Sequence, residues 1–207
     1  MVSDPIPNAL ESHFYNRDTV IVAKDLIGCL LWREHETSWR SWRIVETEAY
    51  TENDPACHAY GRKKGRAAML YAEPGTAYVY LSYGMHYCLN VVTEPVNTAG
   101  AVLIRGLEPL PTSSHEVSSP KQTPNILRTD GPGRLTRALE ITQELLNGKM
   151  LTEWSHGLYI SKGNGPQGKI ITTTRIGITK APDFPWRFYE LGNPWVSVRN
   201  KAAEAEH

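Results

Sequence analysis

The sequence lacks an excess of charge of either sign. Its 22 Lys and Arg residues are balanced by 22 Asp and Glu residues, so the formal net charge is zero and the isoelectric point is near 7.1. A protein that holds nucleic acid by bulk electrostatics is expected to be basic, because its phosphate contacts come from Lys and Arg. Composition therefore weighs against general polyanion binding, and any phosphate contact must come from local clusters.

Segments that mark several other protein classes are also missing. No run of about 18 apolar residues could span a bilayer, and the first seven residues lack the basic and apolar regions of a secretory signal. The three cysteines, Cys29, Cys57 and Cys88, are odd in number, far apart and without CxxC spacing. This pattern predicts reduced thiols rather than disulfides or a structural zinc site. We therefore expect a cytoplasmic or nuclear protein, neither secreted nor membrane-bound.

What is present fits one domain over residues 1–207, a length that allows a sizeable core. Residues 109–130 are rich in Pro, Ser and Thr and weakly patterned, which predicts a mobile surface loop. Elsewhere, periodicity and turn signals predict helices over 20–27 and from 132 onward, a hairpin over 77–92 with its turn at 82–84, and strands over 29–32, 43–50, 101–107, 158–161 and 172–178.

The strand over 43–50 carries two carboxylates that a core strand does not need. Side chains alternate between the two faces of a strand, so Glu46, Glu48 and Tyr50 share one face, with next neighbours roughly 7 Å apart. A buried carboxylate costs several kcal/mol unless it is paired or protonated. These glutamates therefore belong either to a reactive site or to a structural ion pair.

Arginines supply the structural alternative for the two glutamates. Arg40 and Arg43 are near them in the chain and could pair with them across a half-exposed strand. Arg105 is the one charge in the apolar strand over 101–107, and a lone arginine in such a strand normally pairs with a core carboxylate. A pair with Arg105 does not exclude a reactive role, because the cation favours the ionised carboxylate.

The hairpin over 77–92 adds aromatic and amide groups. Tyr80 lies in its first strand, and Tyr83 at its tip is either an ordinary surface residue or a wedge between base pairs. Asn90 interrupts an apolar run, so its amide must bond inside the protein or to a ligand. With His58 from the preceding loop, aromatic walls, an acid and hydrogen-bonding groups suit a pocket for a flipped nucleobase.

Basic residues gather at two further places, and each has a plain alternative. One cluster, which is either a solvated face or a set of phosphate contacts, consists of Arg62, Lys63, Lys64 and Arg66. The other is Arg134 beside a glycine-opened helix start at 131–133. That start could accept a phosphate, although helix capping alone explains the glycines.

Short motifs follow one another over nearly the whole chain. They are Arg43-Ile-Val-Glu-Thr-Glu-Ala-Tyr50, Asp54-Pro-Ala-x-His58, Pro74-Gly-x-x-Tyr-Val-Tyr80, Tyr83-Gly-x-x-x-Cys-x-Asn-Val91, Ala101-Val-Leu-Ile-Arg105, Gly131-Pro-Gly-x-Leu135, Arg175-Ile-Gly-Ile178 and Pro185-Trp-Arg-Phe188. In this order they resemble the alkyladenine type of 3-methyladenine DNA glycosylase. One motif alone would not be specific, but the ordered series is.

The resemblance implies a single α+β domain with a curved antiparallel sheet flanked by helices and a protruding hairpin that enters the DNA minor groove. It implies a monomeric, monofunctional enzyme without metal or other cofactor, which acts on double-stranded DNA. It would remove alkylated purines such as 3-methyladenine and 7-methylguanine, with hypoxanthine and ethenoadenine as further candidates. Glu48 matches the general base that activates water, and Arg105 matches the arginine that holds the water or the adjacent phosphate. Tyr83 matches the side chain that fills the vacated space in the duplex.

The same resemblance implies the walls of a base pocket. Tyr50, His58 and Tyr80 match the residues that enclose the flipped base. Asn90 matches a residue that crowds the 2-amino group of guanine. Arg62, Lys63, Lys64 and Arg134 are the expected contacts to the DNA backbone. The family commonly carries a Thr-Pro-Arg-Asn-like run near residues 62–69, and the sequence here departs from it.

Three other readings compete with a glycosylase. A metal-dependent hydrolase would use Glu48, Asp54, His58 and His86, but Pro55 breaks the turn after Asp54 and no third ligand follows at a metal spacing. A binding module would sense damaged bases without cutting. An ordinary core would simply pack the tyrosines.

Overall fold

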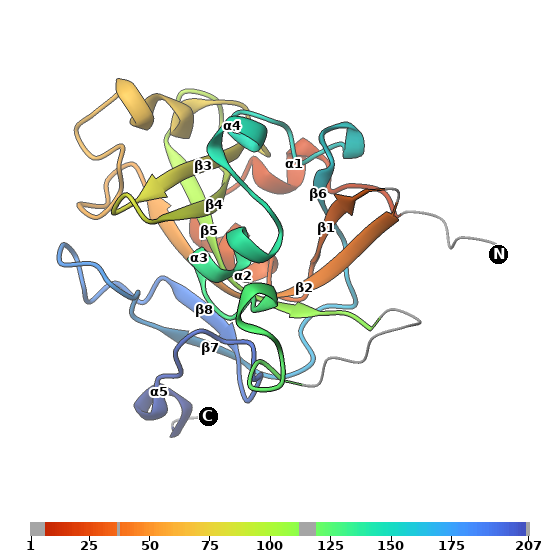
Figure 1. Cartoon of the computed structure of the whole chain (residues 1–207). Helices are drawn as coiled ribbons and strands as arrows, with labels where there is room; N and C mark the ends of the chain where they lie inside the picture. The colour runs from red at the N-terminus through yellow and green to blue at the C-terminus, as the bar shows by residue number, and fades with distance from the viewer. Residues whose placement is uncertain (1–6, 37, 112–118, 206–207) are drawn as a thin grey trace.

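The computed structural model describes residues 7–36, 38–111 and 119–205 (Figure 1). The elements in chain order are α1 (Ser12–Tyr15), α2 (Thr19–Asp25), β1 (Leu30–His35), β2 (Ser38–Thr51), η1 (Gly65–Tyr71), β3 (Ala77–Ser82), β4 (His86–Val92), β5 (Gly100–Pro109), η2 (Asn125–Leu127), α3 (Pro132–Ala138), α4 (Gln143–Leu146), η3 (Trp154–His156), β6 (Leu158–Ser161), β7 (Ile170–Thr173), β8 (Arg187–Glu190) and α5 (Lys201–Ala205), where η denotes a 3₁₀ helix.

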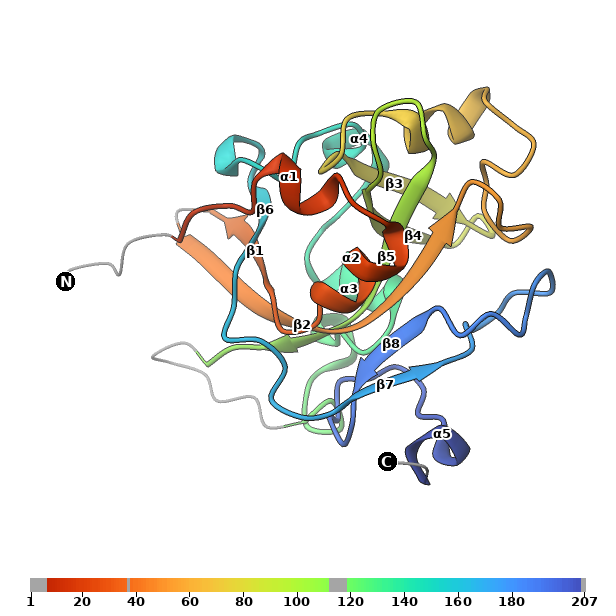
Figure 2. The same ribbon diagram turned by 180° about the vertical axis from the view of Figure 1, so that it is seen from behind.

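Strand β2 is the centre of an eight-stranded antiparallel sheet. β5 pairs with one edge of β2, while β1 and then β8 pair with the other edge. The main path is β3-β4-β5-β2-β1-β6, and β7 joins through β8. The sheet curls around α2 and α3, and the β3–β4 hairpin extends to one side (Figures 1 and 2). The predicted α+β class with a curved sheet and a protruding hairpin is confirmed.

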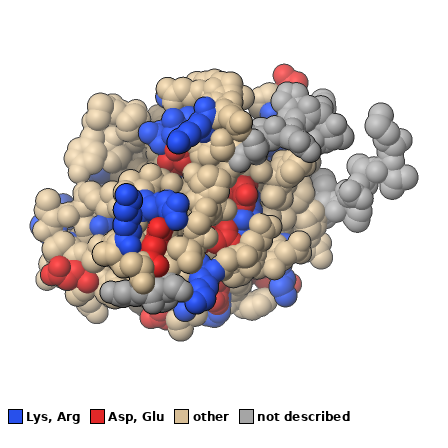
Figure 3. Space-filling view, turned by 90° about the horizontal axis from the view of Figure 1, so that it is seen from below, with Lys and Arg blue, Asp and Glu red and all other residues tan. Residues whose placement is uncertain are grey.

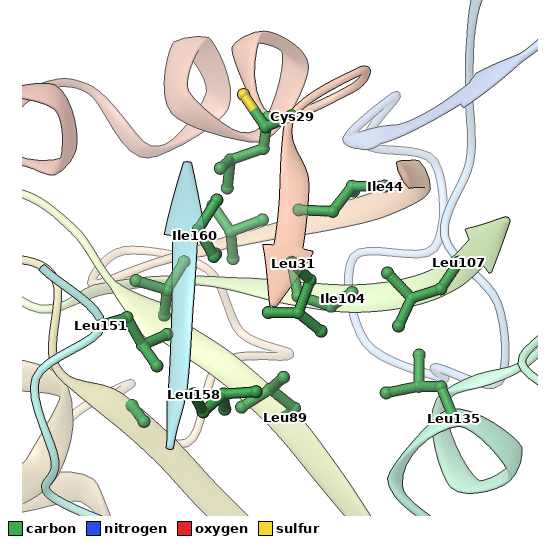
Figure 4. Close-up of a cluster of buried hydrophobic side chains, with 14 of the residues drawn as sticks. Cys29, Leu31, Ile44, Leu89, Ile104, Leu107, Leu135, Leu151, Leu158 and Ile160 are labelled. Atoms are coloured by element: carbon green, nitrogen blue, oxygen red, sulfur yellow. The ribbon is translucent and has the colours of Figure 1, made fainter. Parts of the chain in front are cut away.

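The concave side of the sheet holds the main core. Helix α2 begins at the predicted cap, because the Asp18 carboxylate accepts bonds from the amides of Val20 and Ile21 at 2.9 and 3.0 Å. Its apolar stripe is buried against leucines and isoleucines of β1, β2, β4, β5, β6 and α3 (Figure 4). Gly28 ends this stretch at φ +90°, and a Cβ there would lie 2.1 Å from the Gly165 carbonyl carbon, so only glycine fits.

A bulge in β2 determines the direction in which the buried charged side chains of the sheet point. The register between β2 and β5 shifts on both sides of Glu46, which lies opposite Gly106. A Cβ on Gly106 would approach the Glu46 Cβ to 3.1 Å, so the glycine makes room for the acid. Glu48 pairs with Leu103, and Arg105 therefore projects from the same face as both glutamates.

The late part of the chain differs from the prediction in one place. β7 ends at Thr173, whereas the sequence predicted a strand over 172–178. The chain leaves the sheet because Arg175 turns inward to a buried ion pair with Asp54 and the Ile176 amide donates to Glu48.

The predicted loop over 109–130 is partly described. Residues 112–118 lie outside the described residues, and the later part contains η2 and an ion pair between Arg128 and Asp130. Mobility of this loop stays a prediction. Within the described ranges, no helix has the length and apolar character needed to cross a bilayer.

Candidate active site

Three segments that are far apart in sequence enclose a cavity. The β3–β4 hairpin, the loop after β2 and the loop between β7 and β8 reach to the same side of the molecule in both views (Figures 1 and 2). They line a cavity of about 630 Å³, a size typical of small-molecule sites. Its lining includes the predicted base-pocket residues Tyr50, His58, Tyr80 and Asn90 and the predicted catalytic residue Arg105. The tyrosines therefore form the wall of a cavity rather than an ordinary core.

Glu48 lies immediately behind the lining of this cavity. Its side chain has zero exposure. Tyr50 Oη donates to Oε2 at 2.8 Å, Arg105 Nη1 donates to Oε2 at 3.2 Å, and the Ile176 amide donates to Oε1 at 2.8 Å. All three donor residues line the cavity. Hydrogen bonds from charged and polar donors stabilise negative charge on the carboxylate.

Glu46 is held by a different set of partners. Arg105 Nε donates to Oε1 at 3.1 Å and Arg187 Nη1 donates to it at 2.9 Å. The amide and hydroxyl of Ser197 donate to the two oxygens at 2.6 and 2.9 Å. Arg187 and Ser197 do not line the cavity. Glu46 is thus a structural acid that fixes one side of Arg105.

The proposed pairing of these glutamates with Arg40 or Arg43 is wrong, and the pairing with Arg105 is confirmed. Arg43 instead pairs with Glu108 and Glu190, and Arg40 is exposed. The strand register explains the difference, since Arg43 lies opposite Glu108 and precedes the bulge.

Two tyrosines and a histidine form the aromatic wall. The rings of Tyr78 and Tyr80 stack with centroids 5.2 Å apart, and the His58 ring meets Tyr80 edge-on at 4.7 Å. His58 Nδ1 shares a 2.8 Å hydrogen bond with Tyr78 Oη. Burial, and then the nearby Arg66 and Arg62, lower the pKa of His58 below 6.5. The wall is therefore uncharged at neutral pH and leaves its π faces available for a cation.

The phenols of Tyr50 and Tyr80 stay protonated. Burial raises the pKa of Tyr80 far above its usual value of 10. Burial and the Glu48 carboxylate do the same for Tyr50. Tyr50 therefore acts as a donor to Glu48 and not as a second anion.

Asn90 and Tyr83 occupy the two positions expected from the hairpin. Asn90 lies at the cavity, where Nδ2 donates to the Tyr78 carbonyl at 3.0 Å. Tyr83 lies at the tip with φ +50° and is 87% exposed, and Met85 beside it is 70% exposed. Large apolar groups at the end of a ribbon are unfavourable in water, so this tip is suited to insertion into a partner.

The predicted phosphate contacts separate into two groups. Arg62 and Arg66 line the cavity, whereas Lys63 lies over the Tyr71 ring at 5.0 Å. Arg134 Nη1 is bonded to Asp130 at 2.9 Å. Figure 3 shows the molecule from below the view of Figure 1, where the Lys and Arg side chains that the structure describes lie in separate groups with acids between them. On this face the basic and acidic residues are thus interspersed, as the zero net charge of the chain suggests.

Sequence reasoning missed the segment over 176–180, which forms one wall of the cavity. The key group there is the Ile176 amide, and a main-chain N–H carries no side-chain signal. Residues 176–178 of this wall lie in the stretch that was expected to be a strand, and Lys180 follows that stretch.

The ligands proposed for a metal-dependent hydrolase are engaged elsewhere. Asp54 is bonded to Arg175 and His58 to Tyr78, while His86 is exposed and rests against Gly133. Among the residues that the structure describes, no three His, Cys, Asp or Glu side chains come together as a metal site.

Comparisons with known proteins agree with this geometry. A family model described as Methylpurine-DNA glycosylase (MPG) matches residues 13–194. A Carboxydothermus hydrogenoformans protein named "Putative 3-methyladenine DNA glycosylase" is 47% identical over 193 residues, which cover 92% of this chain and 99% of that protein. Proteins of the same name from Methanoculleus marisnigri and Salinibacter ruber are 44% and 41% identical, over 92% and 94% of this chain and 99% and 97% of their own length. The chain belongs to the methylpurine-DNA glycosylase family and is a DNA-repair hydrolase that acts on N-glycosyl bonds.

Proposed function

We propose that this chain excises alkylated purines, including 3-methyladenine and 7-methylguanine, from double-stranded DNA by a flipping mechanism. The extruded base enters the cavity between Tyr50, His58 and Tyr80, and Tyr83 fills the gap that it leaves in the duplex. The enzyme acts as a monomer in the compartment that holds the DNA, and it uses water without a cofactor.

The observation that carries this proposal is the position of Glu48. One acid lies behind an aromatic cavity and is bonded only by groups that line it. Because the carboxylate has no exposed surface, the attacking water must reach it between Tyr50 and Arg105, which both donate to Oε2. Glu48 takes a proton from that water, the new C–O bond forms at C1′, and the bond from C1′ to the purine nitrogen breaks.

The neutral aromatic wall favours cationic bases. A purine alkylated at N3 or N7 carries a positive charge, so it binds electron-rich rings with about 0.5–2 kcal/mol of cation–π attraction. Base stacking on an aromatic wall adds roughly 1–3 kcal/mol. Such a base also leaves as a neutral molecule without further protonation, whereas a neutral purine needs a proton from an acid. Cationic lesions should therefore react faster than hypoxanthine.

The test uses alkylated duplex DNA and chromatography of the released base. The wild-type chain should release 3-methyladenine and 7-methylguanine, and the rate of release by Glu48→Gln should be lower by a factor of about 10²–10⁴. The variant should still bind lesion-containing duplex, because the amide leaves the aromatic wall in place. Glu73→Gln, at an exposed glutamate, is the matched control and should keep the full rate.

Two results would contradict the proposal. Equal base release by Glu48→Gln and wild type would remove Glu48 from the mechanism. Lesion binding without any base release by the wild type would instead favour the binding module.

A further inference from the structure

Asp54 and Arg175 form a completely buried ion pair behind the cavity. Arg175 Nη2 donates to Asp54 Oδ1 at 2.9 Å, Nη1 donates to Oδ2, and both side chains have zero exposure. Nη1 also donates to the Ala49 carbonyl at 2.9 Å, which ties the pair to the end of β2. Asp54 Oδ1 accepts a further bond from the Ala56 amide at 3.0 Å. The guanidinium is thus held in one place by several contacts.

The guanidinium of this pair lies against the ring of Tyr50. Arg175 Cζ is 4.6 Å from the centroid of the Tyr50 ring and 5.3 Å from that of Trp186. Tyr50 lines the cavity, whereas Arg175 is sealed from it. The ring therefore separates a fixed positive charge from the space for the base. Stacking contacts are about 3.5 Å, so the charge of a base on Tyr50 would lie roughly 8 Å from the guanidinium.

The charges at this end of the cavity cancel. Three buried carboxylates pair with three buried guanidinium groups, namely Glu46, Glu48 and Asp54 with Arg105, Arg187 and Arg175. A base in the cavity therefore meets no net charge from this set. Asp54 is bonded to neither Glu48 nor Arg105, so its charge can be removed without changing a direct contact of the proposed general base.

We propose that Asp54 is a specificity-determining residue, because by neutralising Arg175 behind Tyr50 it allows the cavity to prefer cationic alkylated purines over neutral purines. This inference rests on the proposed function. Without the carboxylate, the guanidinium repels a cationic base through the ring but does not repel a neutral one. At an effective dielectric constant of about 20, two unit charges roughly 8 Å apart change an equilibrium about thirtyfold.

Two neutral replacements and one double variant test the proposal. Asp54→Asn and Asp54→Ser both leave Arg175 uncompensated. The asparagine can keep the Ala56 bond, and the serine leaves room for water at the guanidinium. Asp54→Asn with Arg175→Gln removes both charges. Single-turnover base release is measured on one duplex with 7-methylguanine and one with hypoxanthine, at a temperature where circular dichroism shows each variant folded.

The readout is the ratio of the two rates, which a loss of stability alone does not move. We expect this ratio to fall by about tenfold to thirtyfold in either single variant and to return to within about threefold of wild type in the double variant. If both lesions slow in parallel and the ratio stays within about twofold, the ion pair is only structural and the inference fails. If the wild type releases neither base, the proposed function itself fails.

Discussion

Two carboxylates on one face of β2 have the same burial but different surroundings. Glu46 and Glu48 both have zero exposure, and both are bonded to Arg105. The remaining partners of Glu46 are Arg187 and Ser197, which lie away from the cavity. We call Glu46, Arg187 and Ser197 the closed side.

The remaining partners of Glu48 define the cavity side. Tyr50 and the Ile176 amide donate to Glu48, and both residues line the cavity. We call Glu48, Tyr50 and Ile176, together with Tyr83 at the hairpin tip, the cavity side. Burial and charge pairing are therefore the same for the two acids, and the location of their remaining hydrogen-bond partners is what distinguishes them; on this difference we base the proposal that Glu48 is the reactive acid.

The largest effect that tests the difference between Glu46 and Glu48 is expected when the closed-side acid, Glu46, is replaced by its amide. Glu46→Gln leaves the buried Arg187 without a carboxylate, so the free energy of unfolding should fall by roughly 3–5 kcal/mol. Base release per folded molecule should stay within about tenfold of wild type, in contrast to the larger loss in Glu48→Gln. Urea unfolding and single-turnover kinetics at low temperature measure the two effects. A folded Glu46→Gln chain with no activity would make Glu46 a second reactive acid.

On the cavity side, Tyr83→Ala should lower the affinity for DNA and leave the stability of the fold unchanged. The exposed ring contributes nothing to the core, whereas a stacking aromatic is worth roughly 1–3 kcal/mol to bound nucleic acid. Affinity for lesion-containing duplex should fall by about tenfold, with unchanged urea unfolding. Fluorescence anisotropy provides the measurement, and Tyr83→Phe should retain the wild-type value. Unaltered affinity in Tyr83→Ala would mean that the tip is an ordinary surface.

Ser197→Ala, on the closed side, should have the opposite effect to Tyr83→Ala: it should lower stability and leave activity unchanged. It removes the hydroxyl that donates to Glu46 at 2.9 Å and keeps the main-chain bond at 2.6 Å. The free energy of unfolding should fall by about 1.5–3 kcal/mol, the typical value of a hydrogen bond to a charged acceptor. The rate of base release should change by less than about twofold. A loss of rate with unchanged stability would mean that Ser197 contributes to the reaction and not only to the stability of the fold.

The local sequence pattern could predict which residues face one another but did not choose between the two acids; only the family resemblance named Glu48 as the general base. Alternation along β2 correctly grouped Glu46 with Glu48, and the apolar strand around Arg105 correctly indicated a buried pair. Most of the partners that differ come from residues 176, 187 and 197, more than 120 positions away, and two of the donors are the main-chain amides of Ile176 and Ser197. Family motifs named His58 and Tyr80, whereas no local pattern indicated that Arg175 leaves the predicted strand.

The smallest effect concerns the charge of the cavity wall as pH falls. Because burial and two arginines lower the pKa of His58, the imidazole stays neutral at pH 7 and is protonated only below 6.5. The unfolded chain binds this proton at higher pH than the folded chain. The contribution of His58 to stability is therefore complete above pH 6.5 and is lost as the pH falls through the folded-state pKa.

A protonated His58 would also repel a cationic base, so release of 7-methylguanine should fall more steeply than release of hypoxanthine between pH 7 and pH 5. The wall is partly open to solvent, which limits the difference to about threefold. His58→Gln has no charge to gain and should give a constant ratio of the two rates over this range. If wild type and His58→Gln have the same pH dependence, the imidazole does not set the charge that the base meets.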